Sequence, residues 1–168
     1  MKPLLALGLL IGMPGLLGHL LAADDDEDDK STPKSALQAF NGVIGSWKGS
    51  GGPVKAQLNP RDKTWTEELS WSWRFKGDDA WMEMAVKDGR HFKGGELRYL
   101  PDKKRYQLTA LDKGGKKLVF EGEHKDGYLR LERNDPEKKE TQRITMNTAA
   151  DGVRFILLFE HRPEGRTL

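Results

Sequence analysis

The stretch VIGSWKGSGGP, residues 43–53, decides the fold of this chain. It places Trp47 among glycines and ends at a proline. A phosphate-binding loop would need the spacing G-x-x-x-x-G-K-[ST] and a helix after it, and the residues that follow Pro53, VKAQLNP, show no helical pattern. Glycine within a strand instead permits sharp bending and close approach of neighbouring backbones. We therefore predict the first strand of a curved sheet, with Trp47 facing inward and plugging the end on which a helix packs.

The rest of the chain alternates between apolar and polar residues in short runs that turn signals separate, as β-strands do. The run TWTEELSWSWRF, residues 64–75, is the clearest of these. Asp126-Gly127 and Asp151-Gly152 predict tight hairpins. Further strands are predicted at residues 80–87, 91–100, 105–112, 116–124, 128–133, 141–148 and 153–161. We predict an all-β fold, an antiparallel up-and-down meander β-barrel, because long crossovers typical of a two-sheet sandwich are missing from this pattern.

One short helix is predicted before the strands. Ser35 and Gln38 have the S-x-x-Q spacing of a capping box, and Leu37 and Phe40 fall on one helical face. The helix is therefore expected over residues 35–40.

The N-terminal region has two further segments. Residues 1–23 combine Lys2, an apolar run and the small pair Ala22-Ala23, which is the pattern of a signal peptide; a retained membrane anchor is the alternative. Six consecutive acidic residues begin at Asp24, and residues 24–34 are predicted to be a disordered acidic leader. The domain proper is then residues 35–168, and the protein is expected to be exported, to the periplasm, the cell surface or the medium.

Cysteine and charge limit the chemistry. The chain has no cysteine, so it has no thiol nucleophile or thiolate metal site. Beyond residue 29 it carries 27 Lys and Arg against 20 Asp and Glu, derived from totals of 28 and 26. These basic residues stand mostly in turns such as DKKR and DKGGKK. We therefore expect no nucleic-acid partner, and no membrane partner once the signal is cleaved.

The inward phase of the strands predicts the lining of a cavity. Methionine and aromatic side chains suit an adaptable apolar pocket, although the same residues also make an ordinary core. Trp81 falls on the opposite, outer face, where it could form a contact surface. The predicted lining is Trp71, Trp73, Phe75, Met82, Met84, Leu97, Tyr99, Leu118, Phe120, Leu131, Met146, Phe155 and Leu157, with Leu108, Leu129, Ile144 and Phe159 in the same phase.

No catalytic residues are predicted. Glu67 lies among inward aromatic residues, where burial would raise the pKa of its carboxyl group and permit acid–base work. Glu121 and Glu123 are out of phase with the interior, so they do not supply the second carboxylate of a glycosidase. Ser70 and Ser72 point outward without a nucleophile elbow. A buried Glu67 bonded to an interior Arg or Tyr is the simpler interpretation.

The opening motif resembles a known superfamily. A helical turn followed by Gly45, Trp47, Gly49 and Gly51 at the start of a meander is similar to the calycins, whose lipocalins carry G-x-W near the same place. The stretch IGSWKGSG is closer to the opening of nitrobindin-like exported barrels. The resemblance covers residues 35–161 in layout and these four residues in motif. It implies a calycin-like barrel that holds a small hydrophobic ligand, or haem in the nitrobindins.

Three histidines are low-ranking candidates for a metal or haem site. His91, His124 and His161 each fall at a strand end in the inward phase, and they could gather at the barrel rim. His161 ends the last strand, the region from which nitrobindins take their iron ligand. No H-x-H or H-E-x-x-H spacing supports ligation, so the prediction is no metal and no cofactor.

The expected function is therefore binding. We expect an exported, non-catalytic barrel that holds a small apolar ligand. One alternative is a barrel with a solid core whose surface binds a protein or a polysaccharide. The other is a haem-binding or hydrolytic barrel.

Overall fold

The computed structural model describes residues 32–53, 64–148 and 154–164. The predicted signal peptide and the six acidic residues of the leader lie outside these ranges. The described residues form α1 (Pro33–Leu37), η1 (Gln38–Val43), β1 (Gly45–Gly51), β2 (Trp65–Lys76), β3 (Asp79–Lys87), β4 (Phe92–Leu100), η2 (Pro101–Lys103), β5 (Arg105–Asp112), β6 (Lys117–Lys125), β7 (Tyr128–Asp135), β8 (Glu140–Thr148) and β9 (Phe155–Pro163).

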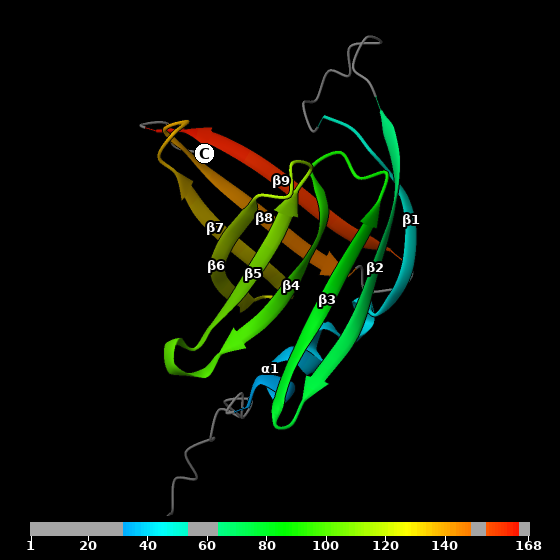
Figure 1. The fold of residues 1–168 in the computed structure, drawn as a ribbon, viewed down its shortest axis with the longest axis vertical. Helices are drawn as coiled ribbons and strands as arrows, with labels where there is room; N and C mark the ends of the chain where they lie inside the picture. The colour runs from blue at the N-terminus through cyan, green and yellow to red at the C-terminus, as the bar shows by residue number, and fades with distance from the viewer. Residues whose placement is uncertain (1–31, 54–63, 149–153, 165–168) are drawn as a thin grey trace, which may run out of the picture.

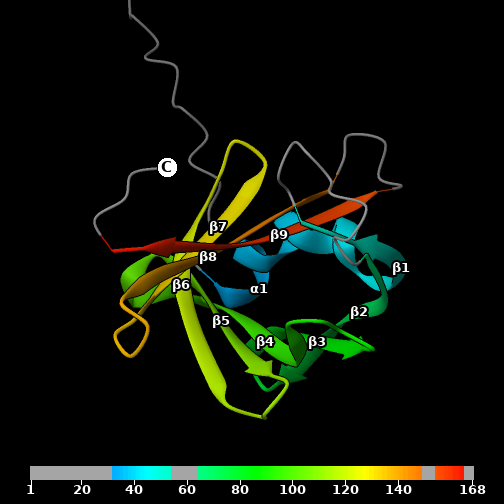
Figure 2. The ribbon, with the colours of Figure 1, turned by 90° about the horizontal axis from the view of Figure 1, so that it is seen from above.

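The nine strands form one antiparallel sheet in chain order, from β1 to β9 (Figure 1). This confirms the predicted all-β meander. The sheet curls into a half-barrel, and α1 lies under one end of the curl (Figure 2). Because β1 and β9 are the two ends of the ladder, a seam separates them. The opposite end of the curl from α1 is called the open end below.

The helix begins two residues earlier than predicted. Thr32 is the N-cap, its side chain accepts a hydrogen bond from the Ser35 amide, and the Ser35 side chain closes the capping box. Pro33 follows the cap, where a proline loses no helical hydrogen bond. The predicted pair Ser35 and Gln38 is therefore wrong, because Ser35 is the third helical residue and not the cap.

The helix is held against the sheet by buried contacts. Leu37 has none of its surface exposed. The Tyr106 hydroxyl on β5 donates a hydrogen bond of 2.9 Å to the Ala36 carbonyl, and the Phe40 ring meets the Tyr106 ring edge-on at 5.3 Å. These contacts close the helix end of the half-barrel. No helix among the described residues is long and apolar enough to cross a membrane.

The β6–β7 hairpin shows the predicted turn chemistry. Asp126 and Gly127 both have positive φ angles, 53° and 76°, as a type I′ turn requires. The other predicted turn of this kind, Asp151-Gly152, lies outside the described residues.

The core follows the predicted inward phase over most of each strand. Fully or largely buried positions include Trp71, Met82, Met84, Leu97, Tyr99, Leu108, Phe120, Leu129, Leu131, Ile144 and Met146, while Trp73, Leu118, Phe155, Leu157 and Phe159 are partly buried against them.

Phe75 departs from this pattern, since 59 % of its surface is exposed. It stands one residue before the end of β2, where the hairpin to β3 projects beyond the core, and its ring stacks on Trp73 at 5.5 Å. The prediction that Phe75 lines the interior is therefore wrong.

Candidate functional site

A candidate site is a cleft at the seam between β1–β2 and β9. The cleft has a volume of about 470 Å³. Its apolar walls are Trp47, Trp65 and Leu69 on one side and Phe155, Leu157 and Phe159 on the other. These residues, together with Gly49, Gly51, Glu67, Arg90 and His91, are called the seam cleft below.

Trp47 forms the helix-side boundary of the seam cleft. Its indole N–H donates a hydrogen bond of 2.7 Å to the Val43 carbonyl at the end of η1, and its ring lies 5.8 Å from the Phe155 ring. The side chain thus faces inward and packs on the core, as predicted. It remains partly exposed, because its ring is also a wall of the cleft.

The glycines of the opening motif have different roles. Gly45 has a φ of +117°, which side chains rarely adopt. A Cβ on Gly51 would overlap the ring of Trp65, the residue paired with it on β2. Gly49 has neither constraint, since nothing lies within 4 Å of the position of a Cβ there. The prediction that every glycine of the motif serves bending or close approach therefore holds for Gly45 and Gly51 and not for Gly49.

Most predicted cavity residues fill the interior instead of lining a cavity. At the helix end, the space beside Phe40, Trp71, Leu97 and Met146 measures only about 30 Å³, roughly the share of one water molecule in the liquid. A barrel of this strand number can be filled by its own side chains. Of the residues in the predicted inward phase, the structure brings Phe155, Leu157 and Phe159 to the seam cleft. It places Trp71, Met82, Met84, Leu97, Tyr99, Phe120, Leu131 and Met146 in the packed core, with Trp73 and Leu118 at its margin.

The predicted lining did not include Trp65 and Leu69, which form the wall of the cleft opposite Phe155 and Leu157. Trp65 and Leu69 share the inward phase with Trp71, so the signal was present in the alternation of β2. Arg90 could not be found that way, because it stands in the connection between β3 and β4 and reaches the cleft through the curvature of the sheet. Its guanidinium carbon lies 4.9 Å from the centre of the Trp65 ring.

Glu67 is the one carboxylate among the described residues that line the seam cleft. Its Oε2 atom accepts hydrogen bonds from the Trp65 indole at 3.0 Å and from the Arg90 amide at 3.3 Å. The prediction of an interior Arg or Tyr side chain as the partner of Glu67 is therefore wrong, because the two donors are an indole and a backbone amide. Trp81 lies on the outer face, as its phase predicts, with the Arg98 guanidinium 4.3 Å above its ring.

The three histidines do not gather at one rim. His91 and His161 lie at the open end, each beside Phe159, with ring distances of 5.0 and 4.5 Å to it. His124 lies at the helix end, 5.0 Å from Phe40. Successive antiparallel strands end at opposite rims, which separates the third histidine from the other two. Among the described residues, no group of three or more His, Asp or Glu side chains is arranged to hold a metal.

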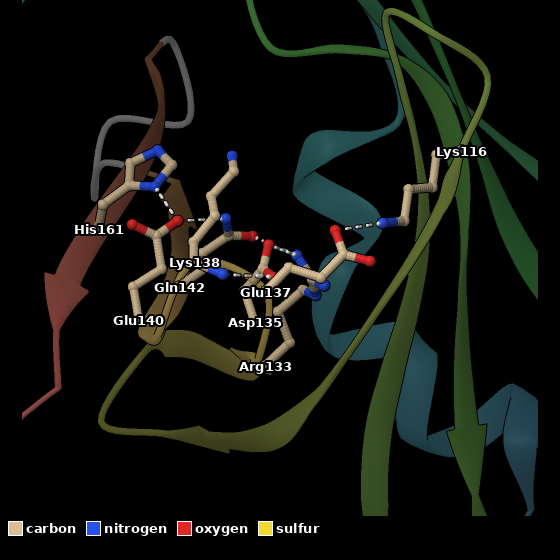
Figure 3. A network of polar contacts seen from close by, with 8 residues as sticks. All are labelled: Lys116, Arg133, Asp135, Glu137, Lys138, Glu140, Gln142 and His161. Atoms are coloured by element: carbon tan, nitrogen blue, oxygen red, sulfur yellow. Dashed lines mark hydrogen bonds and ion pairs between the residues drawn. The ribbon is translucent and has the colours of Figure 1, made fainter.

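A chain of polar contacts runs across the interior face at the open end (Figure 3). His161 Nδ1 lies 2.9 Å from Glu140, and Gln142 donates to the same carboxylate at 2.7 Å. Arg133 donates to Gln142 at 2.6 Å and to Asp135 at 3.3 Å. Gln142 and Asp135 are only 3 % and 6 % exposed, so their hydrogen bonds offset the cost of burial.

The pKa values at this end follow from these contacts. Partial burial, and then the nearby charges of Arg90 and His161, hold the pKa of His91 below its ordinary value of 6.5. Hydrogen bonds from Gln142 and His161 lower the pKa of Glu140. For Asp135, burial acts to raise the pKa, but the Lys138 amide and Arg133 outweigh it and the net shift is downward.

No protein-family model, curated protein or solved structure matches this chain. The calycin resemblance therefore rests on the motif of Gly45, Trp47, Gly49 and Gly51 and on the meander.

Proposed function

We propose that this chain is an exported, non-catalytic binding protein with a calycin-like half-barrel, which holds a small, largely apolar molecule in the seam cleft. The observation that carries the proposal is the cleft itself, with about 470 Å³ of space between two apolar walls. Ligand sites in proteins typically measure about 300–1,000 Å³ and combine apolar walls with a few polar groups.

The same geometry favours the seam over the barrel interior as the place of binding. The interior near the helix is packed, whereas the cleft is open beside Trp47 and Trp65. Two tryptophans in the walls offer large apolar contact area at low cost in side-chain entropy. Glu67 is already held by two donors, which suits a structural role and not that of a general acid.

A fluorescence titration tests the proposal. The neutral probe N-phenyl-1-naphthylamine is expected to bind saturably and to lose affinity by about tenfold or more in Gly49→Leu. Nothing lies within 4 Å of a Cβ at Gly49, so the new side chain can extend into the seam cleft without displacing the core. Ser46→Leu is the matched control, because Ser46 is exposed on the same strand in the opposite phase.

Two results would contradict the proposal. One is saturable binding that Gly49→Leu leaves unchanged. The other is binding that disappears in Phe75→Ser instead, which would favour the alternative of a surface-binding module at the exposed β2–β3 hairpin.

A further inference from the structure

A second hollow adjoins the seam cleft at the open end. It measures about 280 Å³ and is called the rim pocket below. Its polar lining comes from four connections or strand ends: Arg90 and His91 before β4, Lys113 after β5, Lys138 before β8, and His161 near the end of β9. The connections and strand ends at the open end of the half-barrel therefore all contribute side chains to the rim pocket.

Positive charge dominates the rim pocket. Its lining holds three cationic side chains, Arg90, Lys113 and Lys138, and one carboxylate, Asp112. No ion pair to these three cations forms within the described part of the chain. Asp112 accepts a hydrogen bond of 2.8 Å from the Lys116 amide.

The neighbouring carboxylates have hydrogen-bond partners of their own, and the charge of Lys138 also acts on both of them. Asp135 binds Arg133 and the Lys138 amide, and Glu140 binds Gln142 and His161. Burial lowers the pKa of His91 most, and the charges of Arg90 and His161 lower it further; Glu67 acts in the opposite direction, and Lys113 adds a smaller lowering. Among the described residues, a negatively charged group would find Arg90 and Lys113 without an ion pair, and Lys138 beside them, whose charge also acts on Asp135 and Glu140.

The two hollows adjoin each other. Arg90, His91 and Phe159 line both of them. A single molecule can therefore place an apolar body against Trp47, Trp65 and Leu157 and a polar end over the rim pocket.

We propose that the ligand of this protein is an apolar molecule with one anionic group, such as a carboxylate, sulfonate or phosphate, which lies in the rim pocket beside Arg90, Lys113 and Lys138. This inference rests on the proposed function, because it assigns the apolar body of the ligand to the seam cleft.

The experiment compares two probes with the same ring system. N-phenyl-1-naphthylamine is neutral, and anilinonaphthalene sulfonate is its sulfonated counterpart. The full mature chain is titrated with each probe at low ionic strength, where screening is weak. We expect the sulfonated probe to bind more tightly and added salt to weaken its binding selectively.

Paired variants locate the charge effect. Lys113→Gln with Lys138→Gln should weaken binding of the sulfonated probe by about threefold to tenfold, as the loss of two partly exposed charge contacts predicts. Binding of the neutral probe should not change. The control is Lys104→Gln with Lys125→Gln, which removes the same charge from hairpins at the helix end and should leave both affinities unchanged.

The outcomes separate the two proposals. The inference is overturned if the neutral probe binds the seam cleft while the sulfonated probe binds no tighter, or if the control pair weakens the sulfonated probe as much as the rim pair does. If neither probe binds, both this inference and the proposed function are wrong.

Discussion

The pair Gly51 and Trp65 shows how one missing side chain shapes the candidate site. The two residues are partners in the β1–β2 ladder, and the Trp65 ring occupies the space that a Cβ on Gly51 would need. The ring is therefore laid against the backbone of β1, where it forms a wall of the seam cleft. The Trp65 indole then reaches Glu67, which fixes the ring from its other end.

The first prediction concerns this contact. Gly51→Ala should displace the Trp65 ring, lower the free energy of unfolding by about 1–3 kcal/mol and weaken binding of the neutral probe. Gly49→Ala is the control, since a methyl group there meets nothing within 4 Å. Urea unfolding and tryptophan emission measure both effects. Equal behaviour of the two variants would show that Trp65 does not lie over Gly51.

The second prediction uses neighbours on opposite faces of β6. Phe120 has none of its surface exposed, whereas 47 % of Val119 is exposed. Phe120→Ala should destabilise the protein by about 3–5 kcal/mol through loss of apolar burial and the cavity left behind. Val119→Ala should stay within about 0.5 kcal/mol of the parent in urea unfolding. The reverse order would mean that the inward phase of β6 has been assigned to the wrong face.

At the same scale, the alternation of apolar and polar residues predicts which face of a strand packs on the core, but not where along its length the strand leaves the core. Trp71 and Phe75 share one face of β2, yet Trp71 is 2 % exposed and Phe75 is 59 % exposed. Alternation with a period of two residues cannot show where a strand leaves the core. That position depends on how far the neighbouring strands extend alongside it. For the same reason, the sequence could not show which inward-facing residues pack in the core and which line the open cleft.

At the scale of elements, the antiparallel pair β7–β8 brings polar residues into an inward-facing row. Leu131 and Arg133 on β7 pair with Ile144 and Gln142 on β8, so the row changes from apolar to polar toward the open end. Arg133 also lies with its guanidinium carbon 5.9 Å from the Phe120 ring. The polar contacts thus cover the end of the core, and the charged side chains lie beyond them at the rim.

The third prediction is a pH dependence of this element pair. The pKa of Glu140 is lowered in the folded state, so its charged form contributes stability above the ordinary value of 4.5, and that contribution is lost as the pH falls further. The parent should therefore lose free energy of unfolding more steeply below pH 4.5 than Glu140→Gln does.

Glu137→Gln is the control for this titration. The Glu137 side chain is 77 % exposed in its ion pair with Lys116, so its removal should leave the parent's slope unchanged. Urea unfolding at a series of pH values measures all three proteins. Parallel curves for the parent and Glu140→Gln would contradict the role given to Gln142 and His161 as donors to that carboxylate.

The elements themselves were largely predictable. All nine strands stand where the apolar alternation and the turn residues place them, since each run and each turn is a local signal. The start of the helix was not predicted correctly, because two overlapping pairs, Thr32 with Ser35 and Ser35 with Gln38, both have the spacing of a capping box. The proline after Thr32 favours the first pair.

At the scale of the whole molecule, the seam is the feature that the sequence did not reveal. Whether β1 meets β9 depends on the summed twist of nine strands, and small differences per strand accumulate around the curl. Trp47 and Phe155 approach across the seam at the helix end, while the cleft opens beyond them toward Trp65 and His91. The site is thus a property of sheet curvature and not of any local motif.

The fourth prediction concerns the mature chain. Lys2, the apolar run after it and Ala22-Ala23 support the proposal of export with removal of residues 1–23. Amino-terminal sequencing of exported protein should begin near Asp24. Recovery of intact Met1 in a membrane fraction would contradict cleavage and would favour an anchored form.

The claim that the seam cleft binds the ligand has a direct test in the five tryptophan indoles. Trp47 and Trp65 line the cleft, Trp71 is buried in the core, and Trp73 and Trp81 lie outside the cleft. The measurement is a two-dimensional proton–nitrogen NMR titration of the isotope-labelled protein with N-phenyl-1-naphthylamine. We predict saturable shifts of the Trp47 and Trp65 indole signals with little change at Trp73 and Trp81. Shifts confined to Trp73 or Trp81 would contradict binding at the seam.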